Sequence, residues 1–264
     1  MQTLTVERDD GVVTVVMSRP EKKNAGSPAM WRELAEAFTE IERMPGDRVV
    51  VLTGAGGEFC SGADLDGFSD DALDSMKRAS HAAQALSALT IPVIAKVDGV
   101  AVGAGWNLAL GCDLVVATDR ARFSQIFIRR ALSLDFGGSW LLPRLVGLQK
   151  AKELAFFGEI LSAAEAYELG LVTRIVPAEE LDSTVESMAR RLVHAPAQAL
   201  SLTKQLLDAA ADGGSIEAAL QRENHVQANN IVGADAAEAR AAFLEKRPAV
   251  FYRHSSQSVP TAHV

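Results

Sequence analysis

The sequence predicts an α/β fold followed by a helical C-terminal region. Apolar runs that are too short for helices recur at Val49–Thr53, Val93–Val97 and Leu114–Ala117, as is typical of strands buried on both faces. Segments with helical periodicity alternate with these runs, which is the pattern of parallel strands joined by right-handed crossovers. From about Leu148 the pattern changes to successive helices.

The chain opens with a predicted β-hairpin and a helix. Thr3–Arg8 and Val12–Ser18 are rich in β-branched residues, and Asp10-Gly11 between them suits a tight turn with positive φ. Ser27 followed by Pro28 is a helix-start signal, and Pro45-Gly46 is the expected end. Between them the apolar side chains recur on one helical face: Trp31, Leu34, Ala35, Phe38 and Ile41.

The last third reads as a helical region. Ser162 and Glu165 have the spacing of a capping box. The predicted helices are Leu148–Phe157, Leu181–His194, Pro196–Ala211, Ser215–Asn230 and Ala234–Glu245. We therefore expect a core over residues 1–195, a helical region over 196–254, and a frayed tail over 255–264, where Ser, Gln and Pro occur without apolar periodicity.

Composition narrows the function class. The 264 residues carry 26 Lys and Arg against 34 Asp and Glu, a net charge of −8, and no basic cluster offsets the excess. Binding to nucleic acid or to anionic lipid is therefore not expected, and small-molecule chemistry is favoured.

Two cysteines cannot form a disulfide framework, and Met1–Asp10 lacks the pattern of a signal peptide, so we expect a cytoplasmic protein with reduced thiols. Ile91–Ala109, the longest candidate membrane span, is interrupted by Pro, Lys, Asp and Gly, so no span is expected.

Common catalytic motifs do not fit. A dinucleotide fingerprint needs a third glycine three residues after the second. That position holds Phe59 after Gly54-Ala55-Gly56, and Leu108 after Gly103-Ala104-Gly105. The sequence has no nucleophile elbow and no phosphate loop. The five histidines show no metal-binding spacing, so no metal is expected.

Two segments of small residues remain as candidates for a ligand-binding site. Glu58–Leu65 and Asp98–Gly105 each follow a predicted buried strand. Small residues allow a ligand to approach the main chain, and amide N–H groups at a helix start attract negative charge, so two such loops can hold one developing oxyanion. The alternative is that these glycines only form tight turns, and sequence spacing does not decide between the two.

At these residues the chain resembles the crotonase, or enoyl-CoA hydratase/isomerase, family, and the resemblance extends from Arg19 to Phe251. Several ordered motifs carry it: Arg19-Pro20 with Asn24-Ala25, Phe59-Cys60-Ser61-Gly62-Ala63-Asp64-Leu65, Asp98-Gly99-Val100-Ala101-Val102-Gly103-Ala104-Gly105, Gly137-Gly138-Ser139-Trp140-Leu141-Leu142-Pro143-Arg144, and Phe243-Leu244-Glu245-Lys246-Arg247. The resemblance implies a spiral of ββα units, a homotrimer or a hexamer built as a dimer of trimers, and an acyl-CoA thioester substrate with no further cofactor.

The resemblance also implies site residues. The main-chain N–H groups of Ala63 and Ala104 would form an oxyanion hole for the thioester carbonyl. The residues implied to contact substrate are Lys22, Ala25, Ser61, Ala63, Asp64, Leu65, Asp66, Ala104, Asn107, Phe127 and Trp140, with Phe243 and Lys246 of a neighbouring subunit at the nucleotide end. By default Lys22 and Lys23 are a solvated pair, Phe243 is helix core, and Asp64 holds its loop through main-chain amides.

Departures from the family pattern concern the reaction. The two positions at which hydratases carry glutamates hold Asn107 and Phe127, neither of which exchanges protons at neutral pH. Asp135 instead resembles the aspartate of the isomerase branch, and one carboxylate suffices to move a proton between two carbons. The resemblance thus implies double-bond or ring isomerisation of an enoyl-CoA in fatty-acid or aromatic-acid breakdown, with catalysis by Asp135, Ala63 and Ala104.

Alternatives remain open from the sequence. Asp135 could cap the following helix, predicted over Gly137–Val146. Asn107 could orient a substrate or bond a neighbouring carbonyl. At the level of function, the alternatives are an enoyl-CoA hydratase that uses another acid or base, and a non-catalytic acyl-CoA binding protein.

Overall fold

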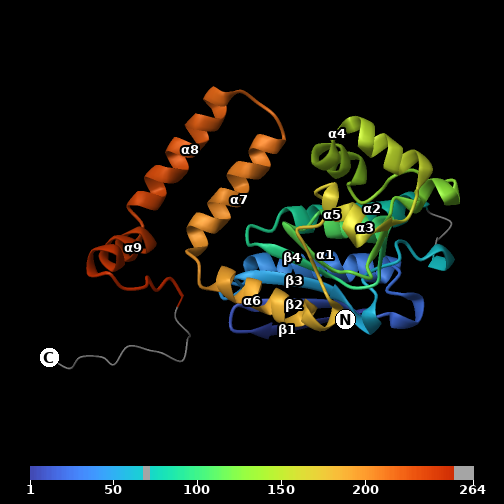
Figure 1. The fold of residues 1–264 in the computed structure, drawn as a ribbon, viewed down its shortest axis with the longest axis horizontal. Coiled ribbons are helices and arrows are strands. Elements are labelled where there is room, and N and C mark those ends of the chain that lie inside the picture. The colour runs from blue at the N-terminus through green and yellow to red at the C-terminus, as the bar shows by residue number, and fades with distance from the viewer. Residues whose placement is uncertain (68–71, 253–264) are drawn as a thin grey trace. The chain divides into compact units, whose positions relative to one another are not determined.

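The computed structural model describes residues 1–67 and 72–252, so the predicted tail 255–264 lies outside the described residues. The chain divides into two compact units, Met1–Ala189 and a second unit that begins at Arg190. The first unit holds both sheets (Figure 1).

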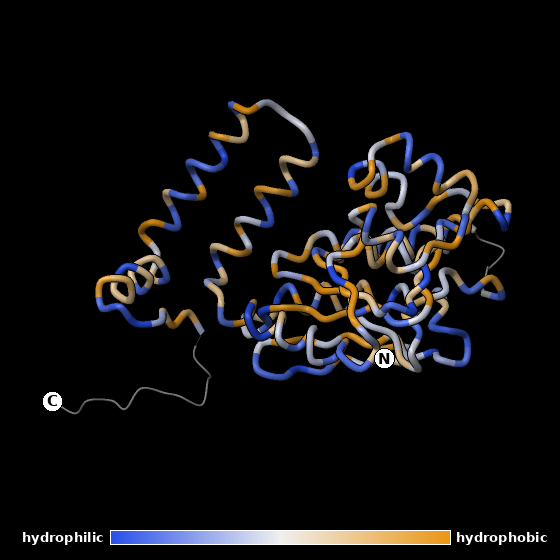
Figure 2. Tube along the Cα trace, in the orientation of Figure 1, coloured by the Kyte–Doolittle hydropathy of each residue, from blue (hydrophilic) through white to orange (hydrophobic). Residues whose placement is uncertain are grey.

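The main sheet has six strands and carries most of the core. Its strands are β1 (Leu4–Asp9), β2 (Val12–Met17), β3 (Val49–Gly54), β4 (Val93–Val97), β6 (Leu114–Thr118) and β9 (Arg174–Val176), in the spatial order β1-β2-β3-β4-β6-β9. The pair β1 and β2 is antiparallel, and every other pair is parallel. Residues 49–53 of β3 are all buried, which explains its unbroken apolar run, seen as orange tube in Figure 2.

A smaller sheet is formed from β5 (Val100–Val102), β7 (Arg122–Ser124) and β8 (Leu161–Ser162). The chain after β3 joins its edge through an isolated parallel bridge between Cys60 and Ala101. This bridge brings together the two segments of small residues that follow β3 and β4.

Six α-helices begin in the described part of the first unit: α1 (Pro28–Arg43), α2 (Ala72–Ser87), α3 (Ala104–Leu110), α4 (Gly138–Phe157), α5 (Ala163–Glu168) and α6 (Leu181–Val193). The Ser27 hydroxyl accepts from the Met30 amide at the start of α1, and both bonds of the Ser162 and Glu165 capping box are present on α5. Within α4 the chain leaves helical geometry at Gly147, where φ is +76°. The second unit holds α7 (Ala197–Ala211), α8 (Ile216–Ile231) and α9 (Ala234–Glu245).

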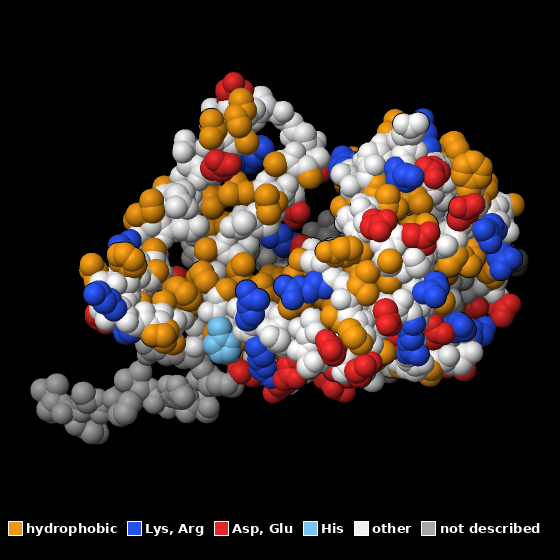
Figure 3. Space-filling view, viewed as in Figure 1, with side chains coloured by type: hydrophobic (Ala, Val, Ile, Leu, Met, Phe, Trp, Pro, Cys, Tyr) orange, Lys and Arg blue, Asp and Glu red, His pale blue; other side chains and the backbone are white. Residues whose placement is uncertain are grey.

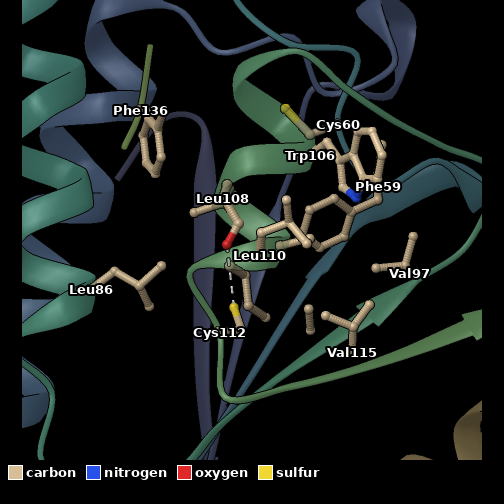
Figure 4. Close-up of a cluster of buried hydrophobic side chains, with 14 of the residues drawn as sticks. Phe59, Cys60, Leu86, Val97, Trp106, Leu108, Leu110, Cys112, Val115 and Phe136 are labelled. Atoms are coloured by element: carbon tan, nitrogen blue, oxygen red, sulfur yellow. Dashed lines mark hydrogen bonds between the residues drawn. The ribbon is translucent and has the colours of Figure 1, made fainter. Parts of the chain in front are cut away.

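The short helix α3 is central to the core of the first unit. All seven of its residues are buried, and the Trp106 ring lies 5.6 Å from that of Phe123. Figure 4 shows Trp106 beside Phe59, and Leu108 and Leu110 in the same cluster. Because its side chains are packed on all sides, α3 is a rigid support for Ala104 at its first position.

The α/β prediction is confirmed, as are the hairpin, the three buried strands and the capping box. The expectation of helices alone after Leu148 is wrong, because β8 and β9 lie in that stretch and β9 forms an edge of the main sheet. Strands of two or three residues are too short to show a period in the sequence. Among the described residues, no helix is long and apolar enough to cross a bilayer.

Candidate active site

A cavity of ≈ 470 Å³ opens in the first unit, and both segments of small residues contribute to its wall. Among the described residues its lining is mostly apolar or small, with two charged side chains, Asp135 and Arg130. The lining residues are Ser61, Gly62, Ala63, Leu65, Met76, Gly103, Ala104, Ile126, Phe127, Arg130, Leu132, Ser133, Leu134 and Asp135.

The register of the Cys60 and Ala101 bridge sets Ala63 beside Ala104. The Cys60 N–H donates to the Val100 carbonyl (2.9 Å), and the Val102 N–H donates to the Cys60 carbonyl (3.1 Å). Ala63 and Ala104 each lie three residues beyond this pair. Between them Gly62 has φ +93°, and a Cβ built there would lie 2.9 Å from the Val102 oxygen and 3.7 Å from the Ala104 nitrogen. Only glycine permits this approach of the two loops.

The amide groups of Ala63 and Ala104 have no acceptor among residues 1–67 and 72–252. The bridge between Gly26 and Ala63 uses the N–H groups of Gly26 and Asp64 and leaves that of Ala63 unused. Ala104 is the first residue of α3, where an amide has no partner within the helix. Both residues line the cavity, so two unused donors are available to an anionic oxygen there.

The third element of the site is the Asp135 carboxyl, which also lines the cavity. Burial raises the pKa of Asp135 to about 6, and its Oδ1 is buried without a hydrogen-bond partner among the described residues. The helix-cap alternative is wrong, because the N-cap of α4 is Gly137 and no side chain caps it. The turn through Phe136 (φ +48°) and Gly137 (φ +78°) directs the Asp135 carbonyl, instead of its carboxylate, to the Gly138 amide at 2.9 Å.

The two positions that distinguish hydratases lie in different surroundings. Phe127 lines the cavity. Asn107 is completely buried and does not line it, and its Nδ2 donates to the Asp135 carbonyl at 2.9 Å while its Oδ1 accepts from Gln125 Nε2 at 2.8 Å. Of the two roles open for Asn107, the structure thus shows the bond to a neighbouring carbonyl.

The chain matches the family model "Enoyl-CoA hydratase/isomerase" over residues 7–254. The chain belongs to this family. A 1,2-epoxyphenylacetyl-CoA isomerase of Escherichia coli (strain K12) is 37% identical, covering 95% of this chain and 98% of the relative. A probable enoyl-CoA hydratase of Rhodobacter capsulatus is 38% identical, covering 94% and 97%. The crystal structure of an enoyl-CoA hydratase from Bacillus anthracis matches with a TM-score of 0.91 at 31% identity, covering 95% and 99%. The chain therefore has the crotonase fold.

In this enoyl-CoA hydratase/isomerase family member, ion pairs tie the Ala63 loop to the chain after β2. Arg19 Nη2 lies 2.7 Å from Asp64 Oδ2, and Arg19 Nη1 donates to the Ala25 carbonyl at 2.5 Å. Asp64 also accepts from the Asp66 amide at 3.2 Å, as expected from the sequence. Burial alone would raise the pKa of Asp64, but the bonds from Arg19 and Lys22 outweigh it and lower that pKa. Asp64 therefore stabilises the conformation of the loop that carries Ala63.

The other residues implied by the resemblance lie in several places. Lys22 is partly exposed and pairs with Asp64 and Asp66. Ser61 lines the cavity, and its hydroxyl donates to the Lys22 carbonyl at 3.1 Å. Trp140 on α4 is outside the lining, with the Arg144 guanidinium 3.0 Å from its ring centroid.

Phe243 and Lys246 belong to the second unit. Phe243 is 83% exposed near the end of α9, so the default interpretation of its side chain as helix core is wrong for this chain by itself. Lys246 is the left-handed C-cap of the same helix.

Sequence reasoning missed several side chains of the cavity wall: Met76, Ile126, Arg130, Leu132 and Leu134. They carry no motif, and their positions follow only from the tertiary fold. It also missed Gln125, whose bond to Asn107 joins residues 18 positions apart.

Cys60 lies outside the cavity lining. Cys60 is fully buried, and burial raises the pKa of its thiol to about 12, which fits a core residue. Within the described ranges, no group of three or more His, Cys, Asp or Glu side chains could hold a metal ion.

Proposed function

We propose that the protein is an acyl-CoA isomerase that moves a double bond, or rearranges a ring, of an enoyl-CoA. The observation that carries the proposal is the placement of the unused amides of Ala63 and Ala104 and the Asp135 carboxyl around one cavity. The amides supply hydrogen bonds to a thioester enolate, and Asp135 exchanges the proton. The similarity to a 1,2-epoxyphenylacetyl-CoA isomerase supports the same branch.

For a 3-enoyl-CoA the step balances with a single carboxylate. Asp135 removes a proton from C2, and the C–H electron pair forms a dienolate whose negative oxygen lies between the two amides. Protonated Asp135 then returns the proton to C4, which leaves a double bond between C2 and C3. The raised pKa of Asp135 suits this cycle, because a carboxyl with a pKa of about 6 can both accept and return a proton at neutral pH.

The cavity wall disfavours the two-carboxylate mechanism. Asp135 is its one acidic residue among those described, Phe127 offers no acceptor, and Asn107 is outside it. Activating a water and protonating the α-carbon from separate groups would require a second titrating side chain on this wall.

The test is the rate at which a 3-enoyl-CoA becomes conjugated. We expect Asp135→Asn to lose at least about 10²-fold in kcat, the contribution of a positioned acid or base. Asp119→Asn, an exposed aspartate after β6 that is outside the lining, is the matched control and should keep the wild-type rate. Unchanged turnover in Asp135→Asn would remove this carboxyl from the mechanism.

A second candidate is an enoyl-CoA hydratase in which Asp135 itself activates water, and the 38% identity to a probable enoyl-CoA hydratase favours considering it. The two reactions differ in mass, because hydration adds one water to a 2-trans-enoyl-CoA and removes its conjugated absorbance. If mass spectrometry shows the hydrated product as the faster reaction, this candidate replaces isomerisation. Tight acyl-CoA binding without turnover of either substrate would instead select the non-catalytic binding protein.

We further propose that the protein assembles as a homotrimer or a dimer of trimers, in which Phe243 and Lys246 of a neighbouring subunit meet the nucleotide end of the substrate. The exposure of Phe243 supports a role outside its own subunit. On this proposal Lys246→Met raises KM for acyl-CoA and leaves kcat unchanged.

A further inference from the structure

Asp135 lies on a turn whose conformation is stabilised by residues that do not line the cavity. Phe136, a residue with a Cβ, adopts φ +48°, and Gly137 follows with φ +78°. A left-handed conformation is unfavourable for phenylalanine, so surrounding contacts must stabilise the turn. Phe136 supplies one contact by packing its ring 5.1 Å from that of Trp31. The Asp135 carbonyl supplies the others, because it accepts from Gly138 and from Asn107, each at 2.9 Å.

The Asn107 amide has one orientation in which both of its ends are used. Its Nδ2 donates to Asp135, and its Oδ1 accepts from Gln125 Nε2. Both side chains are completely buried, so no solvent competes for these bonds. The Asp135 carbonyl can only accept, so a flipped Asn107 would place oxygen against oxygen at that bond. With Nδ2 fixed there, Asn107 Oδ1 is left to accept from Gln125, whose own Oε1 is buried without a partner among the described residues.

Packing holds the same group in place. A Cβ built on Gly138 would lie 2.3 Å from Asn107 Nδ2 and 2.7 Å from its Cγ, so the amide rests directly on the glycine backbone. Asn107 also lies three residues after Ala104, on the same side of α3. One buried helix therefore carries the Ala104 amide and the side chain that holds the Asp135 turn.

We propose that Asn107, whose Oδ1 is held by a hydrogen bond from Gln125, is a positioning residue that sets the place of the Asp135 carboxylate relative to the Ala104 amide. This inference rests on the proposed function, in which Asp135 exchanges the proton. Since neither amide side chain lines the cavity, their effect reaches the reaction only through Asp135. Positioning of this kind changes the chemical step and leaves binding of the thioester unaltered.

The test measures kcat and KM for a 3-enoyl-CoA in Asn107→Ala, in Gln125→Leu and in the double variant, together with the dissociation constant of a saturated acyl-CoA. We expect kcat to fall roughly 10²-fold in Asn107→Ala and about tenfold in Gln125→Leu, the scale of a displacement near 1 Å, with KM and the dissociation constant unchanged. Because Gln125 acts only through Asn107, the double variant should equal Asn107→Ala alone.

Thr53→Val is the matched control. It removes a comparable buried bond, from Thr53 Oγ1 to the Lys96 carbonyl at 2.9 Å, at a site outside the cavity lining. It should lower the melting temperature and leave kcat per folded molecule at the wild-type value. If Asn107→Ala fails to fold, Gln125→Leu alone carries the test through its loss in kcat at constant KM.

Three results would overturn the inference: wild-type kcat in the folded variants, a loss confined to KM, or losses that multiply in the double variant. These outcomes are separable from failure of the proposed function. If Asp135→Asn abolishes turnover while the amide variants retain it, only the positioning role fails. If Asp135→Asn retains turnover, the proposed function itself fails.

Discussion

At the residue scale, the ionised Asp135 carboxylate that the proposed reaction needs also lowers the stability of the fold. The Asp135 carboxyl is buried, Oδ1 has no partner in the part of the chain that the structure describes, and burial raises the pKa to about 6, above the value of 3.8 for a free aspartate. The folded state therefore binds this proton more tightly than the unfolded chain does. Ionisation of Asp135 costs folding free energy, and this cost is complete above pH 6 and is lost as the pH falls from about 6 toward 3.8.

Asp135→Asn should therefore stabilise the fold while it abolishes turnover. At pH 8 we expect an increase in unfolding free energy on the order of 1–3 kcal/mol, which shrinks as the pH is lowered from the folded pKa of about 6 toward the free value of 3.8. Urea denaturation at pH 8 and pH 5 measures the difference between variant and wild type. An increase that is equal at both pH values, or a destabilised variant at pH 8, would contradict a buried ionised carboxyl.

The wild-type rate should follow the same group. Because only the ionised carboxylate removes a proton, kcat/KM is expected to fall below a midpoint near pH 6, the pKa set by burial of Asp135. Initial rates between pH 5 and 8 test this expectation. A midpoint near the ordinary aspartate value would place the base in a solvated environment.

At the scale of elements, the oxyanion loop depends on the Arg19 and Asp64 pair. Asp64 is nearly buried, so Arg19→Met leaves a carboxylate with one bonded cation fewer and frees the loop that carries Ala63. We expect a loss of at least about tenfold in kcat, because the Ala63 amide loses its fixed position. Arg8→Met is the control, since Arg8 pairs with the buried Asp47 in a similar way outside the cavity lining. It should lower stability alone, and equal losses of kcat in the two variants would contradict the assignment.

The elements also show which features a sequence can predict. β3 was predictable because a strand buried on both faces is continuously apolar, and α1 because Ser27 caps an amphipathic helix. The strand β9 was not, since three residues carry no period. Ala63, Ala104 and Asp135 emerged only through family resemblance, because no local pattern reports that three distant segments line one cavity. The partner of Asn107 required coordinates for the same reason, as its target is a carbonyl 28 positions away.

At the scale of the whole molecule, the second unit leaves apolar side chains uncovered. Neither α7 nor α8 contains a buried residue among those described, although each is fifteen or sixteen residues long. Figure 3 shows hydrophobic side chains spread over α7, α8 and α9 on the face viewed. Helices are stabilised chiefly by packing of an apolar face, so we expect these to be covered by other subunits.

Light scattering should accordingly give the mass of a trimer or a hexamer, and the melting temperature should rise with protein concentration. A monomer of 28.1 kDa with a concentration-independent melting temperature would contradict assembly through this unit.

The most direct test of the account is incorporation of deuterium into a 3-enoyl-CoA in heavy water, followed by mass spectrometry. If Asp135 removes a carbon-bound proton while Ala63 and Ala104 hold the enolate oxygen, wild-type enzyme should yield a conjugated isomer with solvent deuterium in a fraction of the product, and Asp135→Asn should yield neither label nor isomer. Label and isomer formed at the wild-type rate by Asp135→Asn would contradict it.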